Sequence, residues 1–289
     1  VKRGLATSLI RAGNPDDALA VWKDIVTHPE AEPADHVNLA DALIRTNNWT
    51  DAEAALNWIA ANRVDRPVGA IIYTQMLNDK GGIECDLTCA RMAEDEYYIV
   101  TGTGFATHDF DWIARNIPTG LNAQLVDVTS SNAVLSLFGP KARDILAGCT
   151  RDDVSHEGFA FASARTIGIA GCPVLAMRIT YVGELGWELH LPVEYALTVY
   201  EALHIAGQPF GLRDAGYRAL ETLRLEKGYR AWSSDIGPDH TPDEAGLGWA
   251  VKMQSNIPFK GREAVQQQRA VGIRKIMTTF TCDDDVILS

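Results

Sequence analysis

The chain lacks a hydrophobic run long enough to span a lipid bilayer, and Asn14 and Pro15 interrupt any secretory signal near its start. A nucleotide-binding fingerprint is also missing, because Gly102–Thr107 has no third glycine and no lysine follows a glycine-rich loop. No serine nucleophile motif occurs, and the 7 histidines fall in no metal-ligand spacing. These absences argue against a membrane-spanning protein, a Rossmann-type NAD or flavin domain, a P-loop protein and a metal site.

Basic residues are scarce as well. The chain has 26 Lys and Arg against 38 Asp and Glu, for a net charge of −12. This balance disfavours nucleic acid and anionic membranes as partners. The 5 cysteines are odd in number and scattered, which predicts free thiols in a cytoplasmic compartment, or in the mitochondrial matrix of a eukaryote; they are Cys85, Cys89, Cys149, Cys172 and Cys282.

The first 66 residues contain an internal repeat. Eight positions recur at an offset of 34 residues: Leu5, Ala6, Leu9, Ile10, Arg11, Asn14, Asp17 and Ala18 match Leu39, Ala40, Leu43, Ile44, Arg45, Asn48, Asp51 and Ala52. This period, with a helix–turn–helix pattern inside it, resembles the tetratricopeptide repeat. The repeats predict either a surface that binds a protein partner or a helical spacer without a ligand, since two units are fewer than an independent solenoid needs.

A change of pattern marks the expected domain boundary. Pro67 and Gly69 end the helical periodicity, and alternation of apolar and polar residues follows. We therefore expect a repeat domain over residues 1–66 and a second domain over residues 67–289. In the second domain, short strands separated by helices predict an α+β fold with largely antiparallel sheets.

The expected elements follow from local patterns. The strands are Ala70–Met76, Ile83–Arg91, Tyr97–Gly102, Arg165–Ala170 and Val174–Thr180. Helical or partly helical segments are His108–Arg115, Asn132–Leu137 with Lys141–Ala147, Ala196–Ala206 and Asp214–Lys227. The segment Arg178–Pro192 is expected to be a hairpin with its turn at Val182–Gly186, which places Trp187, Leu189 and Leu191 on one face and Glu188 and His190 on a polar outer face.

Several motifs together carry a family resemblance. They are Tyr73–Thr88, Val126–Ser130 with Phe138–Arg143, Tyr181–Glu188, Leu223–Asp235 and Asp243–Lys252. These segments resemble the folate-binding aminomethyltransferase family, which includes the glycine cleavage T-protein, and most closely its relatives fused to dimethylglycine and sarcosine dehydrogenases and oxidases. The resemblance covers roughly residues 70–289 and implies that the cofactor is tetrahydrofolate.

The resemblance also implies roles for particular residues. Asp86 matches the carboxylate near the reacting folate nitrogens, although it could instead cap the preceding turn. Glu188 matches the carboxylate that binds the pterin ring, and Tyr73 and Tyr181 match aromatic residues of the same channel or are half-buried core rings. Arg224 matches an arginine that contacts folate or forms a structural ion pair.

Two departures from the family pattern limit the expected function. Helical repeat sequence stands where the family domain begins, and the C-terminal barrel and the flavin domain are not found, so the folate domain is expected to be incomplete at both ends. The implied activity is transfer of a one-carbon unit from an aminomethyl or iminium donor in dimethylglycine, sarcosine or glycine catabolism, giving methylenetetrahydrofolate. A separate flavin dehydrogenase domain or a lipoyl carrier protein would supply that donor. The alternatives are an interaction protein that uses its repeats, and a folate sensor without turnover.

Overall fold

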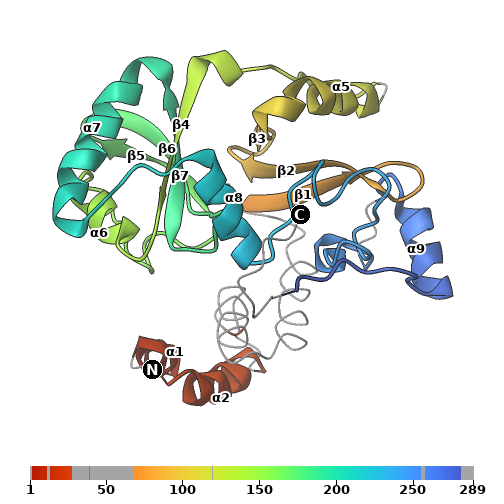
Figure 1. Cartoon of the computed structure of the whole chain (residues 1–289), viewed down its shortest axis with the longest axis horizontal. Coiled ribbons are helices and arrows are strands. Elements are labelled where there is room, and N and C mark those ends of the chain that lie inside the picture. Colours follow the sequence, from red (N-terminus) through yellow and green to blue (C-terminus); the bar gives the residue numbers. More distant parts are fainter. Residues whose placement is uncertain are drawn as a thin grey trace. The chain divides into compact units, whose positions relative to one another are not determined.

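The computed structural model describes residues 2–11, 14–27, 39, 68–118, 120–254 and 258–280. The chain divides into two compact units, and Figure 1 labels their helices and strands. The first unit comprises Val1–Arg66, Leu77–Gly82 and Pro238–Thr278, and the second comprises Pro67–Met76, Ile83–Gly237 and Thr279–Ser289. No helix in the described part of the chain is both long enough and apolar enough to cross a membrane.

The first unit begins with a helix pair. Helix α1 is Lys2–Arg11 and α2 is Pro15–Val26, with Pro15 in the first turn, where its missing N–H costs no hydrogen bond. Asn14 precedes α2 as expected, but its side chain makes no capping hydrogen bond. The apolar faces form a small core of Ala6, Ala18, Trp22, Ile25 and Leu39. Apart from Leu39, the second copy of the predicted repeat lies outside the described residues, so the repeat stays a prediction.

The rest of this unit joins a tight turn to the C-terminal part of the chain. The turn Asn78–Gly82 packs against Pro238, and helix α9, Arg262–Val271, supplies the buried Val265 beside Gly81. The side-chain oxygen of Asn78 accepts hydrogen bonds from the amides of Lys80 and Gly82, each at 3.0 Å. The amide nitrogen of Asn78 donates to the carbonyl of Pro238 at 3.3 Å. These bonds explain the asparagine, and the φ of +81° at Gly81 favours glycine there.

Gly82 leaves no space for a side chain. A Cβ atom at this position would lie 1.7 Å from the carbonyl oxygen of Pro238. We expect Gly82→Ala to destabilise the protein by about 2–4 kcal/mol, because a backbone group must move. Gly104→Ala is the matched control, since nothing lies within 4 Å of its Cβ position. Urea unfolding midpoints of both variants test this, and equal midpoints would contradict it.

The second unit contains a three-stranded and a four-stranded sheet. The smaller sheet has the order β1-β2-β3, with β1 at Ile71–Leu77, β2 at Ile83–Arg91 and β3 at Tyr97–Val100. The larger sheet has the order β4-β7-β6-β5, with β4 at Asn132–Phe138, β5 at Ala164–Ile169, β6 at Cys172–Met177 and β7 at Gly186–Pro192. Its neighbouring strands are antiparallel, and so are β2 and β3, which confirms the predicted largely antiparallel α+β class.

Helices cover one face of the larger sheet. Helix α6 is Ala142–Ala147 and α7 is Ala196–Gly207, and Figure 1 shows both on the same side of the strands. Ile145, Leu146, Val199 and Leu203 from these helices pack with Trp187, Leu189 and Leu191 of β7 in one core cluster. Trp187 is fully buried, so the predicted apolar face of β7 is confirmed.

Short backbone contacts join the two sheets inside this unit. Ala70 pairs with Ser163, and the amide of Ile71 donates to the carbonyl of Ala162 at 2.9 Å. A second core cluster of Ile71, Ala90, Ala164 and Met177 lies at this junction. The remaining α-helices of the unit are α5, Ala106–Asn116, and α8, Tyr217–Glu226. Single 3-10 turns in the two units occupy Thr103–Phe105, Thr129–Ser131, Val193–Tyr195, Gln208–Phe210 and Gly248–Ala250.

Three local predictions were wrong. Asn132–Leu137 is strand β4, because pairing along its whole length with β7 outweighs a weak helical pattern. The first arm of the predicted hairpin, Arg178–Tyr181, is not a strand: β6 ends at Met177, which pairs with Glu188. His190 does not lie on an exposed face, because only 2 % of its side chain is exposed.

Candidate functional site

Asp86 is a half-buried carboxylate on β2. Ile83, Cys85 and Leu87 are buried while Glu84, Asp86 and Thr88 are partly exposed, so Asp86 lies on the less buried face of the strand. Burial raises the pKa of the Asp86 carboxyl to about 6. A hydrogen bond from Tyr73 and the nearby amide of Gln75 act in the opposite direction, and the charge of Asp109 adds to the increase. Asp86 therefore titrates close to neutral pH, where an acid–base group is most useful.

Tyr73 and Gln75 lie on β1, next to the Asp86 carboxyl. They are two residues apart on one strand and so project from the same face. Burial, followed by the negative charge of Asp86, raises the pKa of Tyr73, which therefore remains a phenol that can donate to the carboxylate.

Three polar atoms at this place are buried without a hydrogen-bond partner among the described residues. They are Oδ1 of Asp86 and both side-chain amide atoms of Gln75. Gln75 lies near enough to stabilise the charged form of Asp86, yet its amide makes no hydrogen bond of normal geometry. Unpaired buried polar atoms are costly, and their concentration here indicates a site for a ligand with hydrogen-bonding groups.

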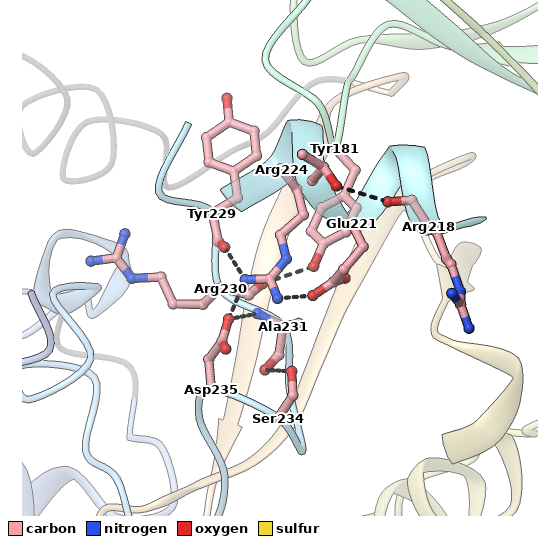
Figure 2. A network of polar contacts seen from close by, with 10 residues as sticks. Tyr181, Arg218, Glu221, Arg224, Tyr229, Arg230, Ala231, Ser234 and Asp235 are labelled. Atoms are coloured by element: carbon pink, nitrogen blue, oxygen red, sulfur yellow. Dashed lines mark hydrogen bonds and ion pairs between the residues drawn. The ribbon is translucent and has the colours of Figure 1, made fainter. Parts of the chain in front are cut away.

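Tyr181 and Arg224 belong to a polar network around α8, drawn in Figure 2. The Tyr181 hydroxyl donates to the carbonyl of Arg230 at 3.1 Å. Burial raises the pKa of Tyr181 to about 12; the charge of Arg224 opposes this increase, while Glu221, Asp235 and Asp86 add to it. The influence of Asp86 on both Tyr73 and Tyr181 places these three residues in one electrostatic neighbourhood.

The Arg224 guanidinium binds other groups of this chain. It forms ion pairs with Glu221 and Asp235 and donates to the carbonyl of Tyr229 at 2.8 Å. Only 3 % of its side chain is exposed, and the hydrogen bonds with Glu221 are the largest cause of its raised pKa. Asp235 also accepts a bond from the amide of Ala231 at 2.9 Å. These contacts favour the structural alternative for Arg224, with Glu221 and Asp235 as its ion-pair partners.

Glu188 lies on β7 beside His190. Oε2 of Glu188 is 3.5 Å from Nε2 of His190, and 19 % of the Glu188 side chain is exposed. Nδ1 of His190 is 3.3 Å from the hydroxyl of Tyr98 on β3, and the two rings meet edge to face with centroids 5.4 Å apart. The carboxylate therefore lies next to a buried histidine at the sheet and has part of its surface exposed.

The four described cysteines are free thiols, as predicted: Cys85, Cys89, Cys149 and Cys172. Cys282 lies outside the described residues. Cys85 approaches His108 and Asp109 of α5, with one potential ligand atom of each within 4.8 Å of the others. His108 contacts Asp109 at 2.9 Å and Glu84 at 3.4 Å, and Asp109 accepts a hydrogen bond from Thr101. These contacts connect α5 to β2, the strand that carries Asp86.

The profile of the GCVT N-terminal domain matches residues 48–255, so the chain belongs to that family. The match begins inside the range of the 34-residue repeat, and residues 48–66 therefore carry both patterns.

Curated relatives agree with this assignment. The chain is 41 % identical to sarcosine dehydrogenase of Homo sapiens over 250 residues, which cover 82 % of this chain and 27 % of that protein. It is 36 % identical to dimethylglycine dehydrogenase of Mus musculus, covering 82 % of this chain and 27 % of the relative. It is 35 % identical to the pyruvate dehydrogenase phosphatase regulatory subunit of Mus musculus, covering 83 % and 27 %. The chain thus spans about a quarter of the length of these relatives.

A solved structure supports the fold. The crystal structure of glycine cleavage system aminomethyltransferase T from Bartonella henselae superposes with a TM-score of 0.63 at 27 % identity. The superposition covers 75 % of this chain and 59 % of that protein. The predicted resemblance to the T-protein and to the dehydrogenase relatives is therefore confirmed.

Proposed function

We propose that this chain binds tetrahydrofolate and transfers a one-carbon unit to it from an aminomethyl or iminium donor. Membership of the GCVT N-terminal domain family supports this proposal, and so do relatives that are named aminomethyltransferase, sarcosine dehydrogenase and dimethylglycine dehydrogenase. The observation that carries it is the group of unpaired buried atoms on Asp86 and Gln75. Folate carries N–H and C=O groups of the kind that such atoms bind.

The residues present would act as follows. Tetrahydrofolate supplies a nucleophilic nitrogen that accepts the one-carbon unit. Asp86 orients that nitrogen and takes up a proton that it releases, which suits a carboxyl with a pKa of about 6. Tyr73 holds Asp86 by a hydrogen bond, and Tyr181 offers a ring face for stacking. Glu188 accepts N–H bonds from the pterin.

A titration tests folate binding. We expect tetrahydrofolate to release heat when it is titrated into the wild-type chain, and Glu188→Ala to weaken binding at least about tenfold, because a charged acceptor is lost. Gln75→Leu should weaken it by a similar factor. Glu184→Ala is the matched control, because Glu184 is 42 % exposed and pairs with Lys227 on the surface. If the wild-type chain produces no binding heat, the proposal is wrong.

One observation favours a second candidate function. A relative of similar identity is named as a regulatory subunit of a phosphatase, so the same domain occurs in a protein whose name describes regulation. Under this alternative, the chain binds a protein partner or binds folate without turnover. Binding of tetrahydrofolate with no transfer above background would support the alternative over the enzyme.

A further inference from the structure

His190 was expected on the polar outer face of β7, but the structure buries it. Only 2 % of its side chain is exposed, and its Nε2 atom has no hydrogen-bond partner among the described residues. A buried imidazole with an unsatisfied nitrogen is unfavourable unless that nitrogen has a use. The nearest acceptor that the structure records for it is Oε2 of Glu188, at 3.5 Å.

The other side of the ring is held by Tyr98. The phenol oxygen lies 3.3 Å from Nδ1, and the edge-to-face contact fixes the plane of the imidazole. Burial raises the pKa of Tyr98, so its hydroxyl keeps the proton and can donate it in a hydrogen bond to Nδ1. A neutral imidazole that accepts at Nδ1 must carry its own proton at Nε2. In that tautomer the Nε2–H lies on the side of the ring where Oε2 of Glu188 is 3.5 Å away.

We propose that His190 is a positioning residue for Glu188: Tyr98 selects the imidazole tautomer, and the Nε2–H of His190 holds one carboxylate oxygen so that the other faces the ligand. This inference rests on the proposed folate site, in which Glu188 binds the pterin. A separation of 3.5 Å is long for a hydrogen bond, and such contacts often shorten when a ligand completes the site.

The backbone of Glu188 is held by strand pairing on both sides. Glu188 pairs with Ser136 of β4 on one side and with Met177 of β6 on the other, so its backbone is fixed in the middle of the sheet. A glutamate side chain has three rotatable bonds and is not oriented by its backbone alone. His190 lies two positions along β7 and on the same face, so its N–H is placed to select one rotamer of Glu188.

Two substitutions separate positioning from packing. Glutamine at residue 190 can place an amide N–H where Nε2–H lies, whereas asparagine reaches only the position of Nδ1. We expect His190→Gln to bind tetrahydrofolate within about threefold of the wild type and His190→Asn to bind it about tenfold or more weakly. Tyr98→Phe should give an intermediate loss, because the tautomer is no longer selected. Calorimetric titration measures all three.

Two results would overturn the inference. If His190→Asn binds tetrahydrofolate as well as the wild type does, Glu188 needs no donor. If His190→Gln and His190→Asn weaken binding equally, His190 serves packing alone. Long-range 1H–15N spectra of the ligand-free chain give a readout that does not depend on folate, and they should show His190 protonated at Nε2 in the wild type and a mixture of tautomers in Tyr98→Phe. A wild-type chain that shows this tautomer but no folate binding would contradict the proposed function and leave the contact itself intact.

Discussion

Asp86→Asn is expected to lower the rate of one-carbon transfer by about 10²–10⁴-fold while tetrahydrofolate binding stays within about threefold of the wild type. Asparagine has the shape of aspartate and can still accept the hydrogen bond from Tyr73, so the ligand site keeps its form. It cannot take up a proton, so the step in which the folate nitrogen is deprotonated loses its base. Loss of rate without loss of affinity is the signature of a group that acts in the transition state.

The donor can be supplied without knowing the natural one. A flavin amine oxidase acting on sarcosine generates the iminium in solution, and a methylenetetrahydrofolate dehydrogenase reports the product by reduction of NADP. The rate above the background without the chain is the quantity to compare. Asp79→Asn is the matched control, because Asp79 is 84 % exposed beside Lys260. Asp86→Asn with the wild-type rate would remove Asp86 from the chemistry.

The same variant has a predicted effect on stability. The carboxyl of Asp86 has a pKa of about 6 in the folded chain, above its ordinary value, so the folded state holds its proton more tightly than the unfolded state does. The contribution of this group to stability is present at pH 3 and is lost as the pH rises through about 6. At pH 7.5 the charged carboxylate therefore opposes folding, and Asp86→Asn should increase the free energy of unfolding by about 1–3 kcal/mol. Urea unfolding at pH 4 and at pH 7.5 tests this, and a gain that does not grow with pH would contradict it.

The sequence predicted most elements because their patterns are local. The hairpin around Asn78–Gly82 follows from a turn that needs two glycines, and β7 from clean alternation around Trp187. The helix α7 differs from its predicted range by one residue. Strand β4 was missed because its apolar run is short and its burial does not alternate cleanly, so only its pairing with β7 settles the conformation.

The site was predicted through the family resemblance, and the structure shows what that resemblance could not supply. His190 contacts Tyr98, which is 92 residues away in the chain, and no local pattern predicts such a contact. Gln75 did leave a signal in the sequence: it lies two residues after Tyr73 and therefore on the same face of the strand. A polar residue at that spacing from a predicted site residue is a candidate that alternation alone identifies.

Substitution of Arg224 is expected to have the second large effect, a loss of stability. Arg224→Met should lower the free energy of unfolding by about 3 kcal/mol, because removing one partner leaves Asp235, Glu221 and the carbonyl of Tyr229 without their donor. The loss is placed at the low end of the range for buried ion pairs, since 27 % of Asp235 and 40 % of Glu221 remain exposed to water. Urea unfolding with an unchanged denaturant slope measures it.

Arg218→Met is the matched control for this substitution. Arg218 is on the same helix, is exposed, and its side chain points away from the network in Figure 2, so its loss should change stability by less than about 0.5 kcal/mol.

Arg224→Lys distinguishes the two roles that the sequence left open. A lysine cannot reproduce the three contacts, so a structural arginine predicts a large loss of stability in Arg224→Lys as well. A variant that unfolds like the wild type but binds tetrahydrofolate tenfold more weakly would instead assign Arg224 to the ligand. The contacts with Glu221, Asp235 and Tyr229 favour the first outcome, because they use both terminal nitrogens of the guanidinium and hold the loop whose Arg230 carbonyl accepts the hydrogen bond from Tyr181.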